Sequence, residues 1–120
     1  MLLAGCGSDN EDEAREAATT PKQAAAQIGQ VRKGLDEALA TYASGDAATA
    51  DEQVGTAYLE HFELVEGPLG KVDEELNERL EDSIREELRD KMKAKAPKAE
   101  VHTLVKAIKA DLAKAEAALR

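Results

Sequence analysis

The sequence predicts an all-α protein, an antiparallel up-down-up-down four-helix bundle that follows a disordered N-terminal tether. The first observation is composition: 42% of the 120 residues are hydrophobic, many of them alanine, and 34% are charged, a mixture that favours helix. The second is that apolar residues recur at spacings of three and four in four segments. The third is that short turns separate these segments, so consecutive helices are expected to run antiparallel.

One domain is expected from this length, with a thin aliphatic core because only 2% of the residues are aromatic. The alternative arrangement is a pair of long helical hairpins that complete their cores by dimerising. Neither an internal repeat nor the alternation typical of strands is found in the sequence.

The first helix is predicted over 21–43. Thr20 is a suitable N-cap and Pro21 suits the first helical position. Gly29 and Gly34 weaken this helix by roughly 1 kcal/mol each relative to alanine, and both would allow a close approach of another helix. The apolar stripe consists of Ile28, Val31, Leu35, Leu39 and Tyr42.

The second helix is predicted over 47–66. Gly45 can end the first helix in a left-handed conformation, and Asp46 can cap the second. Gly67 and Pro68 then break or bend the helix, because proline disfavours a helical conformation in the residue before it. The side chains on one face are Val54, Tyr58, His61, Phe62, Val65 and Leu69.

Asp73 is expected to start a third helix over 74–95, and Pro97 separates this helix from a fourth over 98–119. The third helix carries an inward stripe of Leu76, Leu80, Ile84, Leu88 and Met92. The fourth has the most regular stripe, made of Val101, Leu104, Val105, Ile108, Leu112, Ala115 and Leu119.

The sole cysteine, Cys6, ends the tetrapeptide Leu3-Ala4-Gly5-Cys6, which resembles a bacterial lipobox. That resemblance implies that residues 1–6 are the remnant of a lipoprotein signal, that Cys6 is lipidated, and that the protein is anchored to a bacterial membrane on the periplasmic or cell-surface side. Residues 7–20 are polar and acidic and are expected to form a flexible tether, with the bundle over 21–120. The alternative is an incidental free thiol.

The net charge of −9 disfavours nucleic acid and anionic lipid as partners and is compatible with cations, although acidity often serves only solubility. No apolar run approaches the roughly 20 residues of a membrane span, so membrane contact is expected only through Cys6.

Several chemistries lack their ligands in this sequence. It contains no Cys-x-x-Cys-His haem site, no second cysteine for a thiolate zinc site, no glycine-rich phosphate loop and no Gly-x-Ser-x-Gly elbow. The Glu-x-x-His pair of di-iron bundles is also missing, since Tyr58 and Ala99 stand three residues before the two histidines. We therefore expect no enzyme, no haem and no nucleotide.

The segment 58–66 concentrates aromatic, histidine and glutamate residues. On a helix, Glu63 and Glu66 would stand side by side on one flank, where two carboxylates can chelate a hard cation. A neighbouring helix would add Glu81 or Glu78, and His61 is a weaker candidate at the border of the apolar stripe. The alternative is a solvated acidic face with a half-buried histidine bonded to a neighbour.

The stretch from Ala57 through the fourth helix resembles the extracytoplasmic helical domain attached to bacterial high-affinity iron permeases of the iron/lead transporter family. The residues that carry this resemblance are Tyr58, Phe62, Glu63, Glu66, Leu69, Val72, Asp73, Glu81 and Ala99-Glu100-Val101. Position 64 departs from the pattern, being leucine where proline is expected, and the Arg-Glu-x-x-Glu motif of the permease itself does not occur.

The resemblance implies a detached, lipid-anchored accessory protein of iron or related metal uptake that binds or passes on a divalent or trivalent cation, or that docks on an iron permease. The expected metal ligands are Glu63, Glu66, Glu81 and His61. The alternative function is a structural or interaction adaptor lipoprotein that binds no metal.

Overall fold

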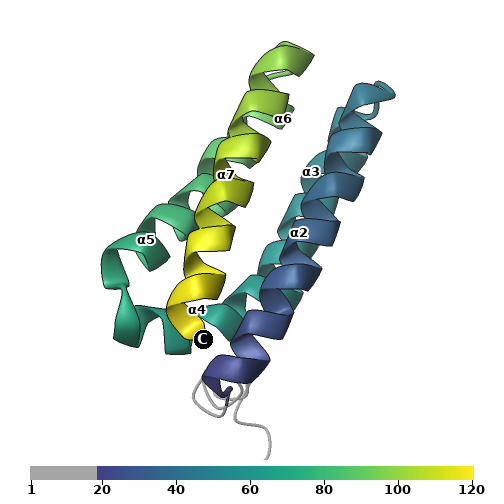
Figure 1. The fold of residues 1–120 in the computed structure, drawn as a ribbon. Coiled ribbons are helices and arrows are strands. Elements are labelled where there is room, and N and C mark those ends of the chain that lie inside the picture. Colours follow the sequence, from purple (N-terminus) through teal and green to yellow (C-terminus); the bar gives the residue numbers. More distant parts are fainter. Residues whose placement is uncertain (1–18) are drawn as a thin grey trace, which may run out of the picture.

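The computed structural model describes residues 19–120, and within them four helices pack around one core, as predicted (Figure 1). The first and last helices are uninterrupted: α2 (Pro21–Ala43) and α7 (Lys98–Leu119). A π-helical segment interrupts each middle helix. The second helix consists of α3 (Ala47–Ala57), η1 (Tyr58–Phe62) and α4 (Glu63–Val72), and the third of α5 (Glu74–Asp82), η2 (Ser83–Leu88) and α6 (Arg89–Lys93). Cys6 and nearly all of the predicted tether lie outside the described residues.

The helix starts follow the predicted capping residues. Thr20 and Gln23 form a reciprocal capping box at the start of α2, with Pro21 as the first helical residue. The carboxylates of Asp46 and Asp73 accept backbone N–H bonds at the starts of α3 and α5. Gly45 has a φ of 105°, the left-handed conformation expected of it in the turn between α2 and α3.

The predicted end of the second helix at residue 66 is wrong, because the helix continues through Pro68 to Val72. Proline costs one backbone hydrogen bond inside a helix. Pro68 is buried beside Val65 and Leu69, and this burial offsets the loss. The chain turns instead at Asp73, and Figure 1 shows α4 leading towards α5 at the lower end of the bundle. The third helix ends at Lys93, slightly before its predicted end.

The predicted stripes form the core, and no polar or charged residue in 19–120 is buried. The exceptions in the stripes are Leu39, Leu104 and His61, which are only partly buried. The core residues of the outer helices are Ala24, Ile28, Val31, Leu35, Ala38 and Tyr42 in α2, and Val101, Val105, Ile108, Leu112, Ala115 and Leu119 in α7.

The two π segments lie where the core residues are spaced by four. In the outer helices the spacing alternates between four and three, which keeps the stripe on one side of an α-helix. In the middle helices the core residues run in steps of four, each of which would carry the stripe about 40° further around an α-helix. The wider π turn holds the stripe on the core side. These runs are Ala50, Val54, Tyr58 and Phe62, and Leu76, Leu80, Ile84, Leu88 and Met92.

Of the two glycines expected to allow close helix approach in α2, only Gly34 does so. A Cβ placed on Gly34 would lie 2.9 Å from the Cβ of Ala57, so α2 and the second helix are in backbone-level contact there. Gly29 has no atom within 4 Å of such a Cβ, and the expectation for it is wrong. Among residues 19–120, no helix has the length and apolarity that crossing a membrane requires.

Candidate functional site

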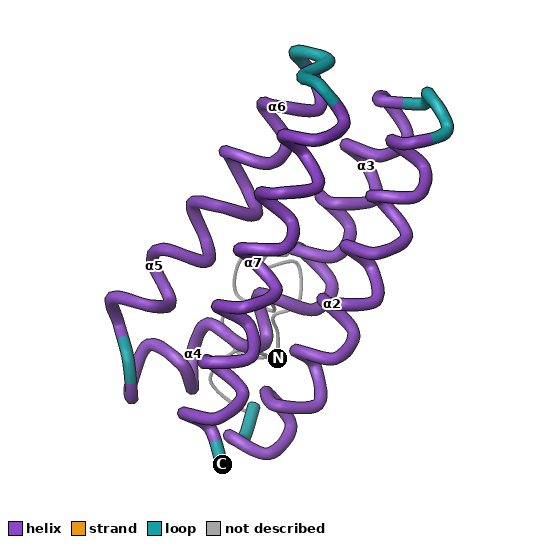
Figure 2. The backbone as a smooth tube through the Cα atoms, turned by 45° about the horizontal axis from the view of Figure 1, so that its top comes forward, coloured by secondary structure: helices purple, strands orange, loops and turns teal. Residues whose placement is uncertain are grey.

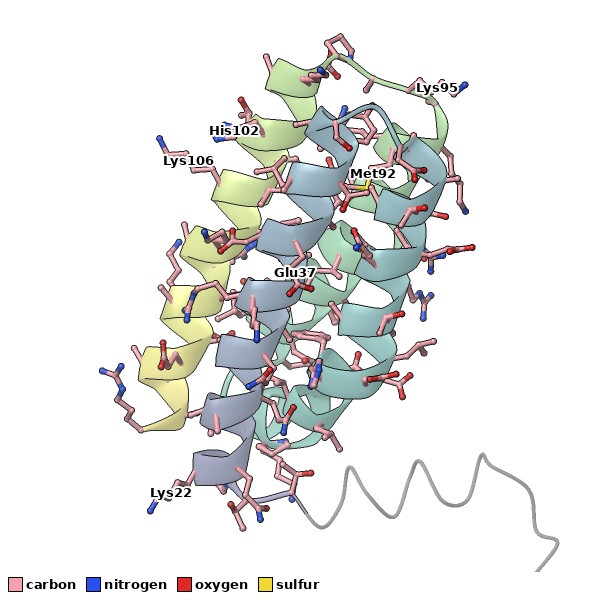
Figure 3. All side chains as sticks on the ribbon, turned by 90° about the vertical axis from the view of Figure 1, so that its right-hand side faces the viewer. Lys22, Glu37, Met92, Lys95, His102 and Lys106 are labelled. Carbon is pink, nitrogen blue, oxygen red and sulfur yellow. The ribbon has the colours of Figure 1, made fainter. Side chains whose placement is uncertain are left out.

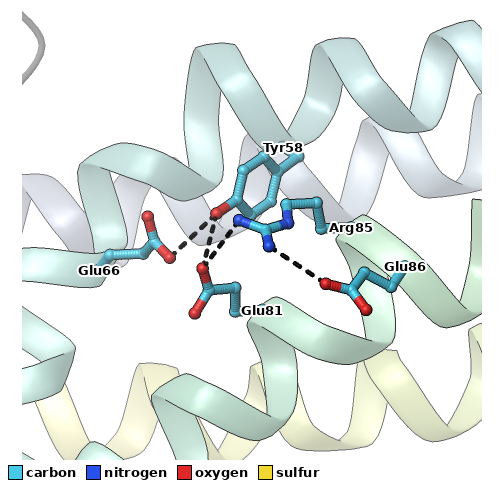
Figure 4. A network of polar contacts seen from close by, with 5 residues as sticks. All are labelled: Tyr58, Glu66, Glu81, Arg85 and Glu86. Atoms are coloured by element: carbon cyan, nitrogen blue, oxygen red, sulfur yellow. Dashed lines mark hydrogen bonds and ion pairs between the residues drawn. The ribbon is translucent and has the colours of Figure 1, made fainter. Parts of the chain in front are cut away.

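Tyr58 is the centre of a polar network between the second and third helices (Figure 4). Its side chain is buried at the start of η1, and its ring packs against Phe62 with 5.7 Å between ring centroids. Its hydroxyl lies 3.1 Å from Oε2 of Glu66 on α4 and 3.3 Å from Oε2 of Glu81 on α5. One phenol therefore gathers two carboxylates from different helices.

Arg85 closes the network on the side of η2. Its guanidinium donates to Oε2 of Glu81 at 3.3 Å and to Oε2 of Glu86 at 3.1 Å. The hydrogen bond to Glu86, followed by the contact with Tyr58, raises the pKa of Arg85. About half of the Arg85 side chain is exposed, so the network opens to solvent on this side.

The hydroxyl of Tyr58 stays protonated far into the alkaline range. Burial is the largest cause that raises its pKa, and the charges of Glu66 and Glu81 raise it further. The phenol therefore acts as a neutral hydrogen-bond donor to the carboxylates. A hydroxyl has a single proton, so Tyr58 can donate fully to only one of the two carboxylates at a time.

Asn77 adds a further oxygen on the same helix as Glu81. It stands one turn before Glu81 on α5, and positions four apart share one helix face. Its side-chain oxygen is buried and has no hydrogen-bond partner within the described residues. Carboxylate and amide oxygens are the ligand types that hard cations such as Mg²⁺ and Ca²⁺ take from proteins.

The structure brings together two of the four predicted metal ligands, Glu66 and Glu81, at the hydroxyl of Tyr58. Glu63 begins α4, nearly one turn before Glu66 on the same helix, and is half-buried. His61 faces α2 instead, where its Nδ1 lies 2.7 Å from Oε1 of Gln27. Over residues 19–120, no three or more His, Cys, Asp or Glu side chains are grouped so that they could hold a metal ion.

The sequence interpretation missed Tyr58 as the connecting group, Arg85 as its neighbour in the network and the buried side-chain oxygen of Asn77. The signal for Tyr58 in the sequence is that it belongs, with Glu66, to the residues that carry the resemblance to the iron-permease domain. Arg85 stands four residues after Glu81 on the third helix, a spacing that allows the intrahelical ion pair the two residues form. No local pattern indicates that the side-chain oxygen of Asn77 is buried.

Two other arginines of the third helix, Arg79 and Arg89, form ion pairs with neighbouring helices. Arg79 forms a two-pronged pair with Asp111 on α7, with donor–acceptor distances of 3.0 and 3.2 Å. The guanidinium of Arg89 donates to Asp51 on α3 at 2.8 Å and lies over Gly55, where a Cβ would come within 2.9 Å of Nη1. These pairs hold the third helix against its neighbours on two sides and so position Glu81.

Comparison with known proteins finds no matching family model, no matching curated protein and no matching solved structure. The resemblance to the helical domain of iron permeases stays a prediction that rests on the residues quoted for it.

Proposed function

We propose that this protein is a lipid-anchored, extracytoplasmic accessory protein of iron or related metal uptake that binds a cation and passes it on, or docks on a permease that does so. The observation that carries the proposal is the convergence of Glu66 and Glu81 on the hydroxyl of Tyr58. Both glutamates belong to the residues that carry the resemblance to the iron-permease domain.

The cation is cargo in this proposal, so a strong and closed site is not required. Mg²⁺, for example, is usually held by one or two carboxylates and retains several water molecules. Glu66 and Glu81 supply two carboxylates from different helices. The side chain of Glu81 is 29% exposed beside Arg85, so solvent reaches this carboxylate. Two protein carboxylates with water as the remaining ligands give a weak, reversible site, which suits transfer to a permease.

Calorimetric titration of the 120-residue chain with ferrous, ferric-citrate, manganous and magnesium ions tests cation binding. Glu66→Gln combined with Glu81→Gln should abolish saturable binding or weaken it at least tenfold, since each lost charge–charge contact is expected to cost about 1.4 kcal/mol or more. The matched control is Glu60→Gln combined with Glu87→Gln. It removes the same charge from two exposed glutamates of the same helices and should leave binding unchanged.

A flat titration at millimolar concentrations of all four ions would refute cation binding and favour the adaptor function. Equal loss in the two double variants would show that only net charge matters, and it would also refute a site at Glu66 and Glu81. A melting temperature for every variant establishes that the bundle is folded in each case.

Lipid anchoring is tested separately. Metabolic labelling with a radioactive fatty acid in a bacterial host, from a gene that supplies a full signal sequence, should label the protein, and Cys6→Ser should abolish the label. Absence of label in the unaltered protein would refute anchoring through Cys6 while leaving the cation proposal standing.

A further inference from the structure

Lysines gather at one end of this acidic protein. Between residues 91 and 109 the chain has six lysines and a single carboxylate, in a protein of net charge −9. Four of these lysines stand close together in the chain, at Lys91, Lys93, Lys95 and Lys98. They lie at the end of the third helix, in the following turn and at the start of α7, and Figure 3 places Lys95 at the opposite end of the bundle from Lys22.

Most of these charges have no acidic partner. Lys91 pairs with Glu100 at 3.0 Å, whereas Lys93, Lys95 and Lys98 take part in no ion pair with any residue in 19–120. All three are exposed. Lys95 is held in a left-handed conformation with a φ of 56°, an uncommon conformation for a residue other than glycine.

The same end of the bundle carries two adjoining hollows. The larger, of about 520 Å³, lies between the turn at Gly45 and the turn at Ala96 and Pro97. The smaller, of about 280 Å³, lies between α2 and α7 and is lined by Leu39, Ala43, Ala99 and His102 together with two shared residues. Tyr42 and Lys98 line both hollows, so the two adjoin at these residues.

The hollows are built into the fold, because two interhelical turns are joined there. The hydroxyl of Tyr42 donates to the carbonyl oxygen of Ala96, linking the turns that Figure 2 shows at one end of the bundle. Asp46 also lines the larger hollow, but its carboxylate is engaged by the backbone N–H of Thr49 at 3.1 Å. The result is an apolar groove bordered by unpaired lysines, which we call the lysine-rimmed groove.

We propose that the lysine-rimmed groove is a docking site for a partner protein that presents an acidic segment with an apolar side chain. Charge complementarity identifies the partner: lysines that form no ion pair with residues 19–120 attract carboxylates, and the apolar lining accepts an aliphatic or aromatic side chain. The exposed large apolar residues of the described chain, Leu59 and Val72, lie on the second helix and not in the groove, which disfavours insertion of this end into a bilayer. The net charge disfavours nucleic acid.

The test uses the 120-residue chain carrying Cys6→Ser and a fluorescein-labelled peptide of Glu, Asp and Leu residues, with binding followed by fluorescence anisotropy. Lys95→Glu combined with Lys98→Glu should weaken binding at least about tenfold, because reversed charges repel the peptide. The matched control, Lys22→Glu combined with Lys71→Glu, makes the same change in net charge at exposed lysines outside the groove and should change binding less than about twofold.

A second variant tests the apolar part without altering charge. Ala99→Trp fills the smaller hollow from an exposed position near the start of α7. The parent chain should bind the leucine-containing peptide more tightly than a peptide in which serine replaces leucine. Ala99→Trp should make the two affinities equal. The double variant with Glu66→Gln and Glu81→Gln should bind the peptide with the affinity of the parent chain. The groove and the proposed cation site are therefore tested independently.

Absence of peptide binding to the parent chain would overturn the proposal. The proposal would also be overturned if the groove variant and the control variant, each with two lysines changed to glutamate, lowered the affinity for the peptide equally. The parent chain is also tested on phosphatidylglycerol vesicles. If it binds the vesicles but not the peptide, and the Lys95→Glu and Lys98→Glu substitutions abolish vesicle binding, the docking proposal is overturned in favour of a membrane surface.

Discussion

The hydroxyl of Tyr58 donates a hydrogen bond to the carboxylate of Glu66, which stands eight residues further along the same continuous helix. A second carboxylate, that of Glu81, reaches the same hydroxyl from the third helix. The two middle helices of the bundle are therefore joined by a polar contact beside a core that is otherwise apolar.

Tyr58→Phe should lower the free energy of unfolding by about 1–2 kcal/mol, the usual cost of removing a hydrogen-bond donor from partly buried acceptors. Urea denaturation at neutral pH measures this loss. In a background of Glu66→Gln and Glu81→Gln the same substitution should cost less, because the charged acceptors are gone. An equal cost in both backgrounds would contradict a role for these carboxylates.

The stability should also depend on alkaline pH through Tyr58. Its pKa is raised in the folded protein, mainly by burial, from an ordinary value of 10.0. A raised folded-state pKa contributes stability that is fully present below the unfolded value and is lost as pH rises above it. Between about pH 9 and pH 11, urea denaturation should show a steeper loss of stability in the parent protein than in Tyr58→Phe. Parallel curves would contradict the raised pKa.

Gly34→Ala and Gly29→Ala should have opposite effects. A Cβ on Gly34 would lie 2.9 Å from that of Ala57 and would force two backbones apart, at a cost of about 1–3 kcal/mol. At Gly29 the space is open, and alanine should stabilise the helix by up to about 1 kcal/mol. Thermal unfolding of the two variants measures both changes, and a stabilised Gly34→Ala would show that the helices can separate without cost.

The Arg79–Asp111 pair should contribute modest stability that acid removes. The hydrogen bond from Arg79 is the largest cause that lowers the pKa of Asp111 from 3.8. A lowered folded-state pKa contributes stability that is present above the unfolded value and is lost as pH falls through the folded value. Because the Arg79 side chain is 49% exposed, Asp111→Asn should cost less than about 1 kcal/mol at pH 7.

Urea denaturation across the acidic range checks this prediction. The difference between the parent protein and Asp111→Asn should shrink as pH falls below about 4, and Arg79→Met should behave in the same way. A difference that does not vary with pH would mean that the pair acts through packing alone.

The helix starts and the core were predictable from the sequence because both depend on local patterns. Thr20, Asp46 and Asp73 are capping residues that precede periodic apolar stripes, and the structure uses all three as predicted. The continuation of the helix through Pro68 was not predictable, because local preference disfavours it and only burial in the assembled core offsets that preference.

The candidate site was predictable only in part. Helical spacing predicts Glu63 and Glu66 on one flank of a helix, but the meeting of Glu66 with Glu81 depends on how two helices pack. The position of His61 against Gln27 on α2 likewise depends on tertiary contacts. The steps of four in the middle stripes were visible in the sequence and indicate the π segments in retrospect.

Those π segments make the middle helices tolerant of a shortened chain in a way that the outer helices are not. A π turn contains one residue more than an α-turn, and removing the exposed Glu87 from η2 would leave Leu88 three positions after Ile84, a spacing that an α-helix accepts. The loss of one residue between Val105 and Ile108 in α7 would instead rotate all later side chains by about 100° and turn their apolar stripe towards water. Single-residue deletions between natural variants of this protein should therefore concentrate in the two middle helices.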